Sequence, residues 1–235
     1  MYKRIFDVIF SFLGLFLFSP FLILLSVVVY IQDFHNPFYL GKRVGKNKRI
    51  FHLIKLRSMV VSAEKLGGDS TAEDDNRITK IGSFIRRFKI DEIPQLINVF
   101  KGDMSFVGPR PQTIDGVDDY TKLEEKLLTV NPGITDFSSI VFSDEGNILL
   151  GEKDPAVAYN QLIRPWKSRL SILYIDKNSL LLDIKLILLT LLAIFSKEKA
   201  IKKLIKTLQS LEAEDELIHV ASRQESLKPS KILGT

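Results

Sequence analysis

The chain has no cysteine in its 235 residues, which excludes disulfides, thiolate nucleophiles and cysteine metal sites. Its three histidines, His35, His52 and His219, lie far apart and lack the spacing of metal ligands. A Walker loop, a nucleophile-elbow serine motif and a dinucleotide fingerprint are also absent from the sequence. These absences argue against P-loop NTPases, nucleophile-elbow serine hydrolases and dinucleotide-dependent dehydrogenases.

Acidic residues are outnumbered by basic ones, and the net charge of +5 gives a pI of about 9.2. A basic excess is typical of proteins that bind nucleic acid, anionic lipid or phosphorylated small molecules. The basic residues are not interleaved with aromatic residues, as they are on nucleic-acid platforms, so we expect no nucleic-acid partner. Because 46% of the residues are hydrophobic, we expect part of the chain to lie in lipid.

An uncharged apolar run from Val8 to Ile31 follows Lys3 and Arg4. It is too long for a signal peptide and no small-residue cleavage site follows it, so we interpret residues 1–32 as a retained membrane anchor. A straight helix over this run would reach about 36 Å, which is enough to cross a hydrocarbon core of about 30 Å.

Ser19-Pro20 lies near the middle of the apolar run. Proline removes a helical hydrogen bond and costs about 3 kcal/mol, which the apolar side chains offset by partitioning into lipid. Each limb alone reaches only about 18 Å, so two limbs that meet at Pro20 could enter and leave the membrane on one face. Basic residues flank both ends of the run. The positive-inside rule therefore gives no direction, and a re-entrant helix and a bent span stay equally open.

Hydrophobic periodicity outlines the segment that follows the anchor. It predicts a short strand within residues 49–61 and a polar loop over residues 62–76. Helical spacing of apolar residues begins at Ile78. A second helix is predicted to begin at Asp91 and to end at Lys101-Gly102.

The C-terminal half is expected to be mostly helical. Helical pieces broken at Pro165 are predicted, and the apolar segment from Leu180 to Phe195 carries Asp183 and Lys185, which favours a buried or interface-lying helix over a spanning one. A further apolar stripe is formed by Ile201, Leu204, Ile205, Leu208 and Leu211. After Glu212 the tail is polar, and we expect it to be disordered.

Asp91 and Glu92 are the strongest candidates for catalysis. Asp91 is placed to cap a helix, with Pro94 inside the first turn, so capping alone explains the pair and is favoured on this pattern. The same helix end would also collect phosphate through its free N–H groups. An ionised aspartate there can attack phosphorus, and a neighbouring carboxylate can bind Mg²⁺.

Several charged residues are candidate ligands for phosphate. Arg110 stands between two prolines, which fix the backbone and hold its guanidinium in one direction. Arg86 lies about one turn before the acidic pair, and Lys101 with Asp103 follows it. Arg43 belongs to the basic stretch after the anchor, where attraction to anionic headgroups is the simpler role for most residues. Arg43 itself is a candidate for the phosphate of a lipid substrate.

Taken together, these segments resemble the bacterial sugar transferases, also called monotopic phosphoglycosyl transferases. The most specific block runs from Ile90 to Pro111 and contains Asp91-Glu92-Ile93-Pro94-Gln95 and Gly108-Pro109-Arg110-Pro111. Lys3-Arg4-Ile5-Phe6-Asp7, Ser19-Pro20 and Lys55-Leu56-Arg57-Ser58-Met59 also match, and the resemblance extends from Lys3 to Phe195. The chain is similar to a minimal form without a long N-terminal extension. Departures at Gly41, at Asp136-Phe137 and within residues 138–146 leave the donor sugar open.

The resemblance implies an α/β, mostly helical fold with a re-entrant N-terminal helix that breaks at Ser19-Pro20. The divisions would be the anchor (1–32), a catalytic domain (33–196), and an amphipathic helix with a disordered tail (197–235). The domain would rest on the cytoplasmic face of the bacterial inner membrane, with amphipathic helices among the inner-leaflet lipids. Whether the chain forms a homodimer stays open.

The resemblance also implies a two-step reaction. Asp91 would attack the β-phosphate of a UDP-sugar, release UMP and form a phosphosugar-aspartate, which undecaprenyl phosphate would then attack. Glu92 would bind Mg²⁺, while Arg110 and Arg86 would hold phosphate. This reaction would be the first membrane step in the synthesis of a capsule, O-antigen, exopolysaccharide or glycoprotein glycan.

Two other hypotheses compete with this one. The chain could be a non-catalytic membrane adaptor of a polysaccharide assembly complex, with the stripe from Ile201 to Leu211 bound to a partner helix. It could instead be a lipid phosphotransferase with a CDP-activated donor, but the spaced aspartates of such enzymes are missing.

Overall fold

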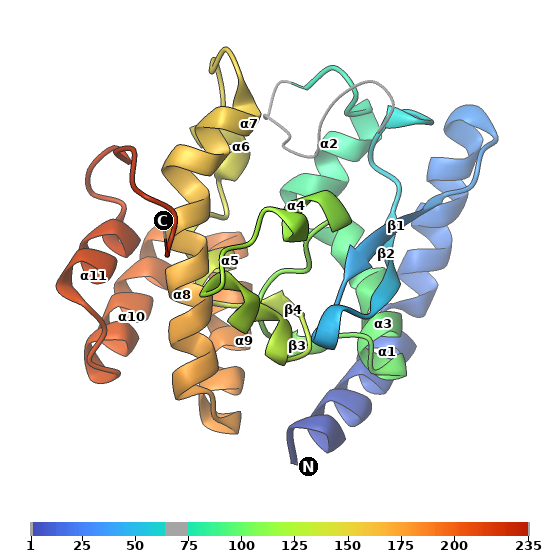
Figure 1. Cartoon of the computed structure of the whole chain (residues 1–235). Helices are drawn as coiled ribbons and strands as arrows, with labels where there is room; N and C mark the ends of the chain where they lie inside the picture. Colours follow the sequence, from blue (N-terminus) through green and yellow to red (C-terminus); the bar gives the residue numbers. More distant parts are fainter. Residues whose placement is uncertain (1, 64–74, 235) are drawn as a thin grey trace.

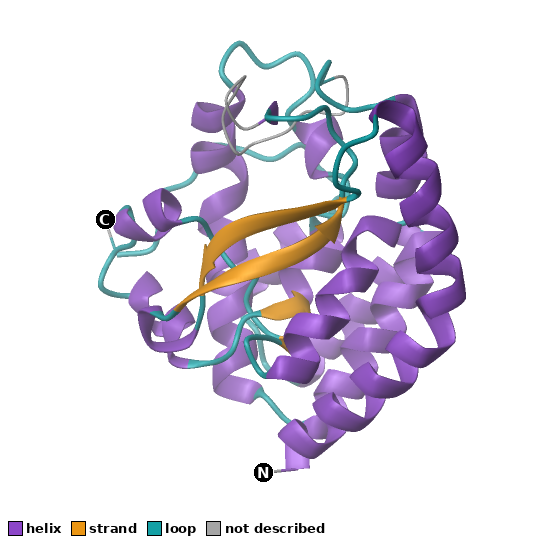
Figure 2. Ribbon diagram, turned by 90° about the vertical axis from the view of Figure 1, so that its right-hand side faces the viewer, coloured by secondary structure: helices purple, strands orange, loops and turns teal. Residues whose placement is uncertain are grey.

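The structure is a computed structural model and describes residues 2–63 and 75–234. The loop predicted over residues 62–76 therefore lies mostly outside the described residues. Helices dominate the fold, and the named strands form two small two-stranded sheets (Figures 1 and 2). This confirms the prediction of a mostly helical protein with little sheet.

The N-terminal helix α1 (Tyr2–Asp33) continues through Pro20. An 18-residue window of α1 has a mean hydropathy of 2.6 and is only 6% buried, so by length and composition the helix could cross a membrane. Pro20 has no N–H to donate to the carbonyl of Phe16, and the Ser19 hydroxyl donates to that carbonyl instead at 2.9 Å. Both views show α1 changing direction part-way along (Figures 1 and 2). The predicted break at Ser19-Pro20 is therefore wrong, because the helix continues and the Ser19 hydroxyl keeps the freed carbonyl hydrogen-bonded.

The first turns of α1 are fixed to the globular part of the chain by polar contacts. Arg4 donates to the carbonyls of Val99 and Phe100 at 2.6 and 2.7 Å, at the end of α3 (Leu96–Lys101). The buried carboxylate of Asp7 accepts a hydrogen bond from the backbone N–H of Phe106 at 3.1 Å. These residues flank the apolar run in the sequence, and the fold uses them for internal contacts.

The last turn of α1 is held in the same way. Arg57 donates to both carboxylate oxygens of Asp33, at 2.5 and 2.6 Å, and lowers the pKa of that carboxyl to about 2. At the opposite end Lys3 pairs with the buried Asp183 at 2.6 Å. Both ends of α1 are therefore bound to the same globular domain.

Strands β1 (Phe38–Val44) and β2 (Ile50–Leu56) form an antiparallel hairpin. β2 confirms the strand predicted within residues 49–61, whereas β1 was not predicted. The buried amide of Asn98 extends this sheet toward α3, because its Oδ1 accepts from the N–H of Ile54 at 3.0 Å and its Nδ2 donates to the carbonyl of His52 at 2.8 Å. This side chain attaches α3 to β2 and so fixes the segment that precedes α3.

Helix α2 (Lys80–Arg87) begins at Thr79, whose hydroxyl accepts from the N–H of Gly82, and it confirms the helix predicted from Ile78. The helix predicted to begin at Asp91 is wrong in its first half, because residues Ile90–Gln95 form the tight 3-10 helix η3 before α3. Lys89 precedes η3 with a left-handed backbone (φ 56°) and gives no side-chain cap. Asp91 therefore lies inside the turn and is not its cap.

Strands β3 (Ser105–Val107) and β4 (Gly133–Thr135) pair in parallel. The backbones approach so closely that a Cβ on Gly133 would lie 2.1 Å from the nitrogen of Gly108. Only glycine allows this contact, since real Cβ atoms do not come so near to backbone atoms. The approach holds the loop that begins at Gly108 against β4.

The main hydrophobic core lies among α8 (Arg164–Lys177), α9 (Leu180–Phe195), α10 (Lys197–Ser210) and α11 (Asp215–Ser222). In Figure 1, α8, α10 and α11 stand on the side of the molecule opposite α1. α9 has the predicted bounds and two faces, with Leu186 buried and Leu181 exposed. Pro165 falls in the first turn of α8, where a proline is tolerated. The remaining short elements are η1 (Lys46–Lys48), α4 (Ile114–Asp118), η4 (Glu124–Thr129), α5 (Phe137–Val141), α6 (Glu145–Ile148), α7 (Pro155–Ala158) and the π-helix η5 (Tyr159–Ile163).

Two expectations for the C-terminal region are wrong. Leu204 and Leu208 of the apolar stripe are fully buried in the main core, so α10 is part of the same core as α8 and α9. The stripe is not free for a partner helix, and the adaptor hypothesis loses the surface on which it depended. Residues 212–234 are also not simply disordered, because α11 forms and the tail returns across the molecule. There the hydroxyl of Thr121 donates to the carbonyl of Leu233 at 2.6 Å.

Candidate active site

Asp91 and Glu92 lie on η3 and face the end of β2. Asp91 is 5% exposed, and the Glu92 side chain is 12% exposed. The ammonium of Lys55 lies between the two carboxylates, 3.1 Å from Oε1 of Glu92 and 3.5 Å from Oδ2 of Asp91. The two carboxylates thus share a cation in a mostly buried position.

Strand alternation explains why Lys55 reaches the pair. Phe51 and Leu53 point into the protein from β2, and Lys55 follows at the same two-residue period. The strand therefore directs the Lys55 side chain toward η3. Lys55 was not among the predicted site residues, although the alternation of β2 is a signal that could have identified it.

Arg110 completes the contacts of Glu92, with its Nη2 2.8 Å from Oε1. Its loop has little freedom, because backbone hydrogen bonds of 2.9 Å hold it to β4 and to β1. These bonds join Gly108 N–H to Thr135 O, Gly133 N–H to Pro109 O, and Val44 N–H to Gln112 O. This geometry agrees with the prediction that the flanking prolines hold Arg110 in one direction, and its role as a phosphate ligand stays a prediction.

The surrounding cations decide the ionisation of Glu92. Burial alone would raise the pKa of this carboxyl, but the charges of Arg110, Lys55 and Lys89 outweigh it and hold the pKa well below its usual value. Lys89 is an exposed residue, but partial desolvation of its ammonium group lowers the pKa of that group. The charge of Glu92 raises the pKa of Arg110. Glu92 is therefore ionised throughout the physiological range.

A second ion pair lies beside Arg110. Lys167 of α8 donates to Glu145 of α6, and this pair lowers the pKa of Glu145 and raises that of Lys167 against the opposing effect of burial. Arg110 and Lys89 also act on Glu145. The acidic pair thus belongs to a continuous group of fixed charges that extends to α8.

The acidic pair has the donor atoms that a hard divalent cation needs. Oδ1 of Asp91 is buried and has no hydrogen-bond partner among the described residues. The described part of the chain contains no cluster of three or more His, Cys, Asp or Glu side chains that could enclose a metal. Mg²⁺ is commonly bound by one or two carboxylates together with water and substrate phosphates. Because Lys55, Lys89 and Arg110 crowd the pair, such an ion fits only when phosphate groups add negative charge.

The other predicted phosphate ligands are not brought into this group. Within residues 2–63 and 75–234, no hydrogen bond or ion pair joins Arg86, Arg43, Lys101 or Asp103 to the acidic pair. Arg86 ends α2 and acts electrostatically on Asp75. The guanidinium of Arg43 donates to the carbonyl of its neighbour at the protein surface. Lys101 and Asp103 follow at the end of α3, where Arg4 binds.

Comparison with known proteins places this site in a family. The family model described as "Bacterial sugar transferase" matches residues 1–197, which includes the anchor, the acidic pair and the Arg110 loop. The chain belongs to the bacterial sugar transferase family. The family match ends at the start of α10, so most of α10, together with α11 and the tail, lies outside it.

Curated relatives agree with this assignment. The chain is 37% identical over 201 residues to galactosyl transferase CpsE of Streptococcus agalactiae, an alignment that spans 80% of this chain and 41% of the relative. It is 46% identical over 110 residues to a putative undecaprenyl-phosphate N-acetylgalactosaminyl 1-phosphate transferase of Bacillus subtilis, over 47% of this chain and 62% of the relative. It is 37% identical over 148 residues to undecaprenyl-phosphate galactose phosphotransferase of Salmonella typhimurium, over 57% of this chain and 31% of the relative. The alignments thus cover less than two thirds of each relative.

Proposed function

We propose that this bacterial sugar transferase moves a sugar-1-phosphate from a UDP-sugar to undecaprenyl phosphate and releases UMP. The names of the Bacillus and Salmonella relatives support the lipid acceptor and the phosphosugar product. The observation that carries the proposal is the buried, unbonded Oδ1 of Asp91, which lies beside a carboxylate and a cluster of cations. This arrangement combines an available oxygen nucleophile with groups that stabilise phosphate.

The reaction proceeds in two displacements at phosphorus. Oδ1 of Asp91 attacks the sugar-bearing phosphorus of the donor, and the bond from that phosphorus to the bridging oxygen breaks as UMP leaves with the electron pair. An oxygen of undecaprenyl phosphate then attacks the same phosphorus, and the bond to Asp91 breaks. Two steps allow a soluble donor and a lipid acceptor to use one small site in turn.

The chain's own cations bind and orient the phosphates. Arg110 has a planar guanidinium that suits bidentate phosphate binding, and Lys55 and Lys89 add point charges beside the acidic pair. Glu92 would hold Mg²⁺, which neutralises phosphate oxygens when it is bound. Since Lys55 and Arg110 both contact Oε1 of Glu92, its other oxygen is the one left for a metal.

A direct test measures UMP release from a panel of UDP-sugars with the membrane-bound enzyme and undecaprenyl phosphate. We expect one or more donors to react, with a requirement for Mg²⁺. Asp91→Asn should abolish turnover, and Glu92→Gln should reduce it by about 100-fold or more, as for the loss of one group that stabilises a transition-state charge. Asp215→Asn, an exposed carboxylate in the first turn of α11, is the matched control and should keep full activity. Full activity of Asp91→Asn would overturn the proposal.

We also propose that α1 enters the membrane and returns to the cytoplasmic face. The contacts of Arg4 and Asp7 at one end and of Asp33 at the other join both ends to a single polar domain. A simple span would need to place these ends, and their partners, on opposite sides of a hydrocarbon core of about 30 Å. The change of direction part-way along α1 supports a helix that stays within one side of the bilayer.

The absence of cysteine makes this topology easy to test. Single cysteines at Tyr2 and His35, both exposed, would report the two ends of α1. A membrane-impermeant maleimide should label neither residue in intact cells and should label both after the membrane is opened. Labelling of one end alone from outside would show a true span.

A further inference from the structure

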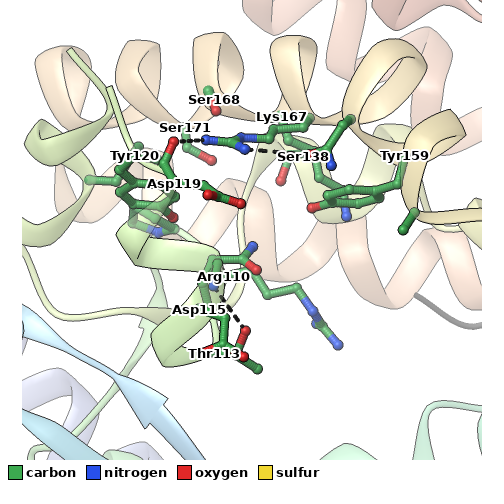
Figure 3. A pocket seen from close by; sticks show the side chains of 17 residues that line it. Arg110, Thr113, Asp115, Asp119, Tyr120, Ser138, Tyr159, Lys167, Ser168 and Ser171 are labelled. Atoms are coloured by element: carbon green, nitrogen blue, oxygen red, sulfur yellow. Dashed lines mark hydrogen bonds between the residues drawn. The ribbon is translucent and has the colours of Figure 1, made fainter. Parts of the chain in front are cut away.

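A cavity of about 190 Å³ lies beside the acidic site, between the loop and helix after Arg110 and the helices η5 and α8. Arg110 belongs to its lining, and the same side chain contacts Glu92 at 2.8 Å. Figure 3 shows the Arg110 side chain extending downward in the view, away from Tyr120 on the left and Tyr159 on the right. The cavity and the acidic pair are therefore neighbours that share one arginine.

The basic side chains of the cavity are held in place by partners. Lys167 is bonded to Glu145, and Arg164 is bonded to the fully buried Glu124 at 2.8 Å. These pairs balance the charges in the wall and fix its shape. Both cations are satisfied by carboxylates of the protein itself, so we do not assign the cavity as a second phosphate site.

The free groups of the cavity are carboxylates, amides and hydroxyls. The side chains of Asp115 and Asp119 have no hydrogen bond or ion pair among the described residues. Figure 3 shows the carboxylate of Asp119 and the hydroxyl of Tyr159 pointing toward one another across the cavity. The side-chain oxygen of Asn160 meets Arg164 at 3.4 Å, which leaves its amide N–H groups available. Such acceptors and donors suit a ligand with many hydroxyl groups.

The aromatic rings of the cavity are less suited to a planar base. The ammonium of Lys167 lies 5.2 Å from the ring centre of Tyr159, and the guanidinium of Arg164 lies 5.8 Å from that of Tyr120. Each ring thus already carries a cation over one of its faces. Recognition by stacking is reduced, and recognition by hydrogen bonds is favoured.

We propose that this cavity binds the sugar ring of the donor and selects among donors by hydrogen bonds that the sugar hydroxyls donate to Asp115 and Asp119 and accept from the Asn160 amide. The inference rests on the proposed function, because it places the diphosphate at Arg110 and the acidic pair. The sugar then extends from the reacting phosphorus into the cavity. A site built to bond hydroxyl groups rejects a donor that lacks one of them or presents it in the wrong direction.

The test compares Asp115→Asn and Asn160→Ala with wild type. Asp118→Asn is the control on the same helix, since Asp118 is exposed and lies outside the cavity lining. Values of kcat/KM are measured for UDP-glucose, UDP-galactose and their N-acetylated counterparts, together with inhibition by UMP. We expect the ratio of kcat/KM between donors to change by about 10-fold or more in the two cavity variants, with UMP inhibition unchanged and with the control like wild type.

Two results would overturn the inference. An equal loss with every donor, together with weaker UMP inhibition, would show that the cavity binds the nucleoside. Unchanged ratios in both cavity variants would show that it does not contact the donor. A Tm within about 2 °C of the wild-type value shows that a variant is folded.

Binding can be measured apart from turnover. In an Asp91→Asn background, calorimetric titration with the same UDP-sugars and with UMP shows whether the cavity substitutions change the preference between sugars. A changed sugar preference without any turnover by wild type would keep the inference and refute the proposed reaction. Turnover by wild type with an unchanged sugar preference would refute the inference and keep the proposed reaction.

Discussion

The contact between Arg110 and Glu92 makes a sharp prediction about pH dependence. Arg110 is the largest of the charges that lower the pKa of Glu92, and burial acts in the opposite direction. In Arg110→Met the desolvation remains while its main counterweight is removed. The pKa of Glu92 should therefore rise toward its ordinary value, so that this carboxylate becomes protonated at a higher pH than in wild type.

The magnitude follows from the geometry. A hydrogen bond between charged groups is worth about 1.5–3 kcal/mol, and about 1.4 kcal/mol corresponds to one pH unit in a pKa. The Arg110 side chain keeps 39% exposure, so solvent screens part of its effect and the lower end of this range applies. We expect the acid limb of kcat/KM against pH to move upward by about 1 pH unit.

The assay is UMP release from about pH 3, below the ordinary carboxyl range, to about pH 8, because the wild-type limb of Glu92 lies at the acid end. Arg110→Met should shift the acid limb of kcat/KM upward in pH. It should also lower the plateau of kcat/KM, because a phosphate ligand is lost. Arg110→Lys should keep the wild-type limb, since it restores the charge, but not the plateau, since it cannot bind phosphate bidentately. Arg49→Met, at an exposed residue just before β2, controls for loss of a positive charge. An acid limb that stays in place or moves downward in Arg110→Met would refute the reasoning.

Three further predictions concern how the fold holds the site. Asn98→Ala leaves two backbone groups of β2 without partners. We expect the free energy of unfolding to fall by about 2–4 kcal/mol and the Tm by about 5–10 °C. A change in Tm below about 1 °C would contradict the role of this amide. Gly133→Ala forces a Cβ against the backbone of Gly108. We expect the free energy of unfolding to fall by about 3 kcal/mol and turnover to be reduced. Wild-type stability and turnover would show that the strands can separate without cost. Arg57→Met returns the pKa of Asp33 from about 2 toward its ordinary value of 3.8. The wild-type contact is fully present above about pH 4 and is lost as the pH falls toward 2. Above pH 4 the variant should therefore show faster hydrogen exchange than wild type in the last turn of α1. Equal exchange in the two proteins would argue against this attachment.

Local patterns predicted the elements that have a strong period of their own. The strand β2 and the helices α2 and α9 follow from the alternation or helical spacing of apolar residues. The rigid hold on Arg110 was also predictable, because a proline lies on each side of it. These features depend on short segments and little on the rest of the chain.

Features that depend on distant contacts were missed. Asp91 has the residue type of a helix cap, but the left-handed Lys89 begins a 3-10 turn that places this carboxylate inside the site. Lys55 reaches the pair only because β2 packs against η3. The stripe on α10 has the pattern of a partner-binding face, and nothing in its period shows that the stripe is covered by the protein's own core. The contacts of Lys55 in particular join residues that are 36 and 37 positions apart.

Covalent capture of the phosphosugar tests the central claim about Asp91 most directly. The enzyme is incubated without undecaprenyl phosphate but with a donor that carries a label in the sugar-bearing phosphate, quenched in acid and analysed by peptide mass spectrometry. We predict a phosphosugar adduct on the peptide that contains Asp91, absent from Asp91→Asn and discharged when undecaprenyl phosphate is added before the quench. An adduct on another residue, or product formation by Asp91→Asn at the wild-type rate, would contradict the account.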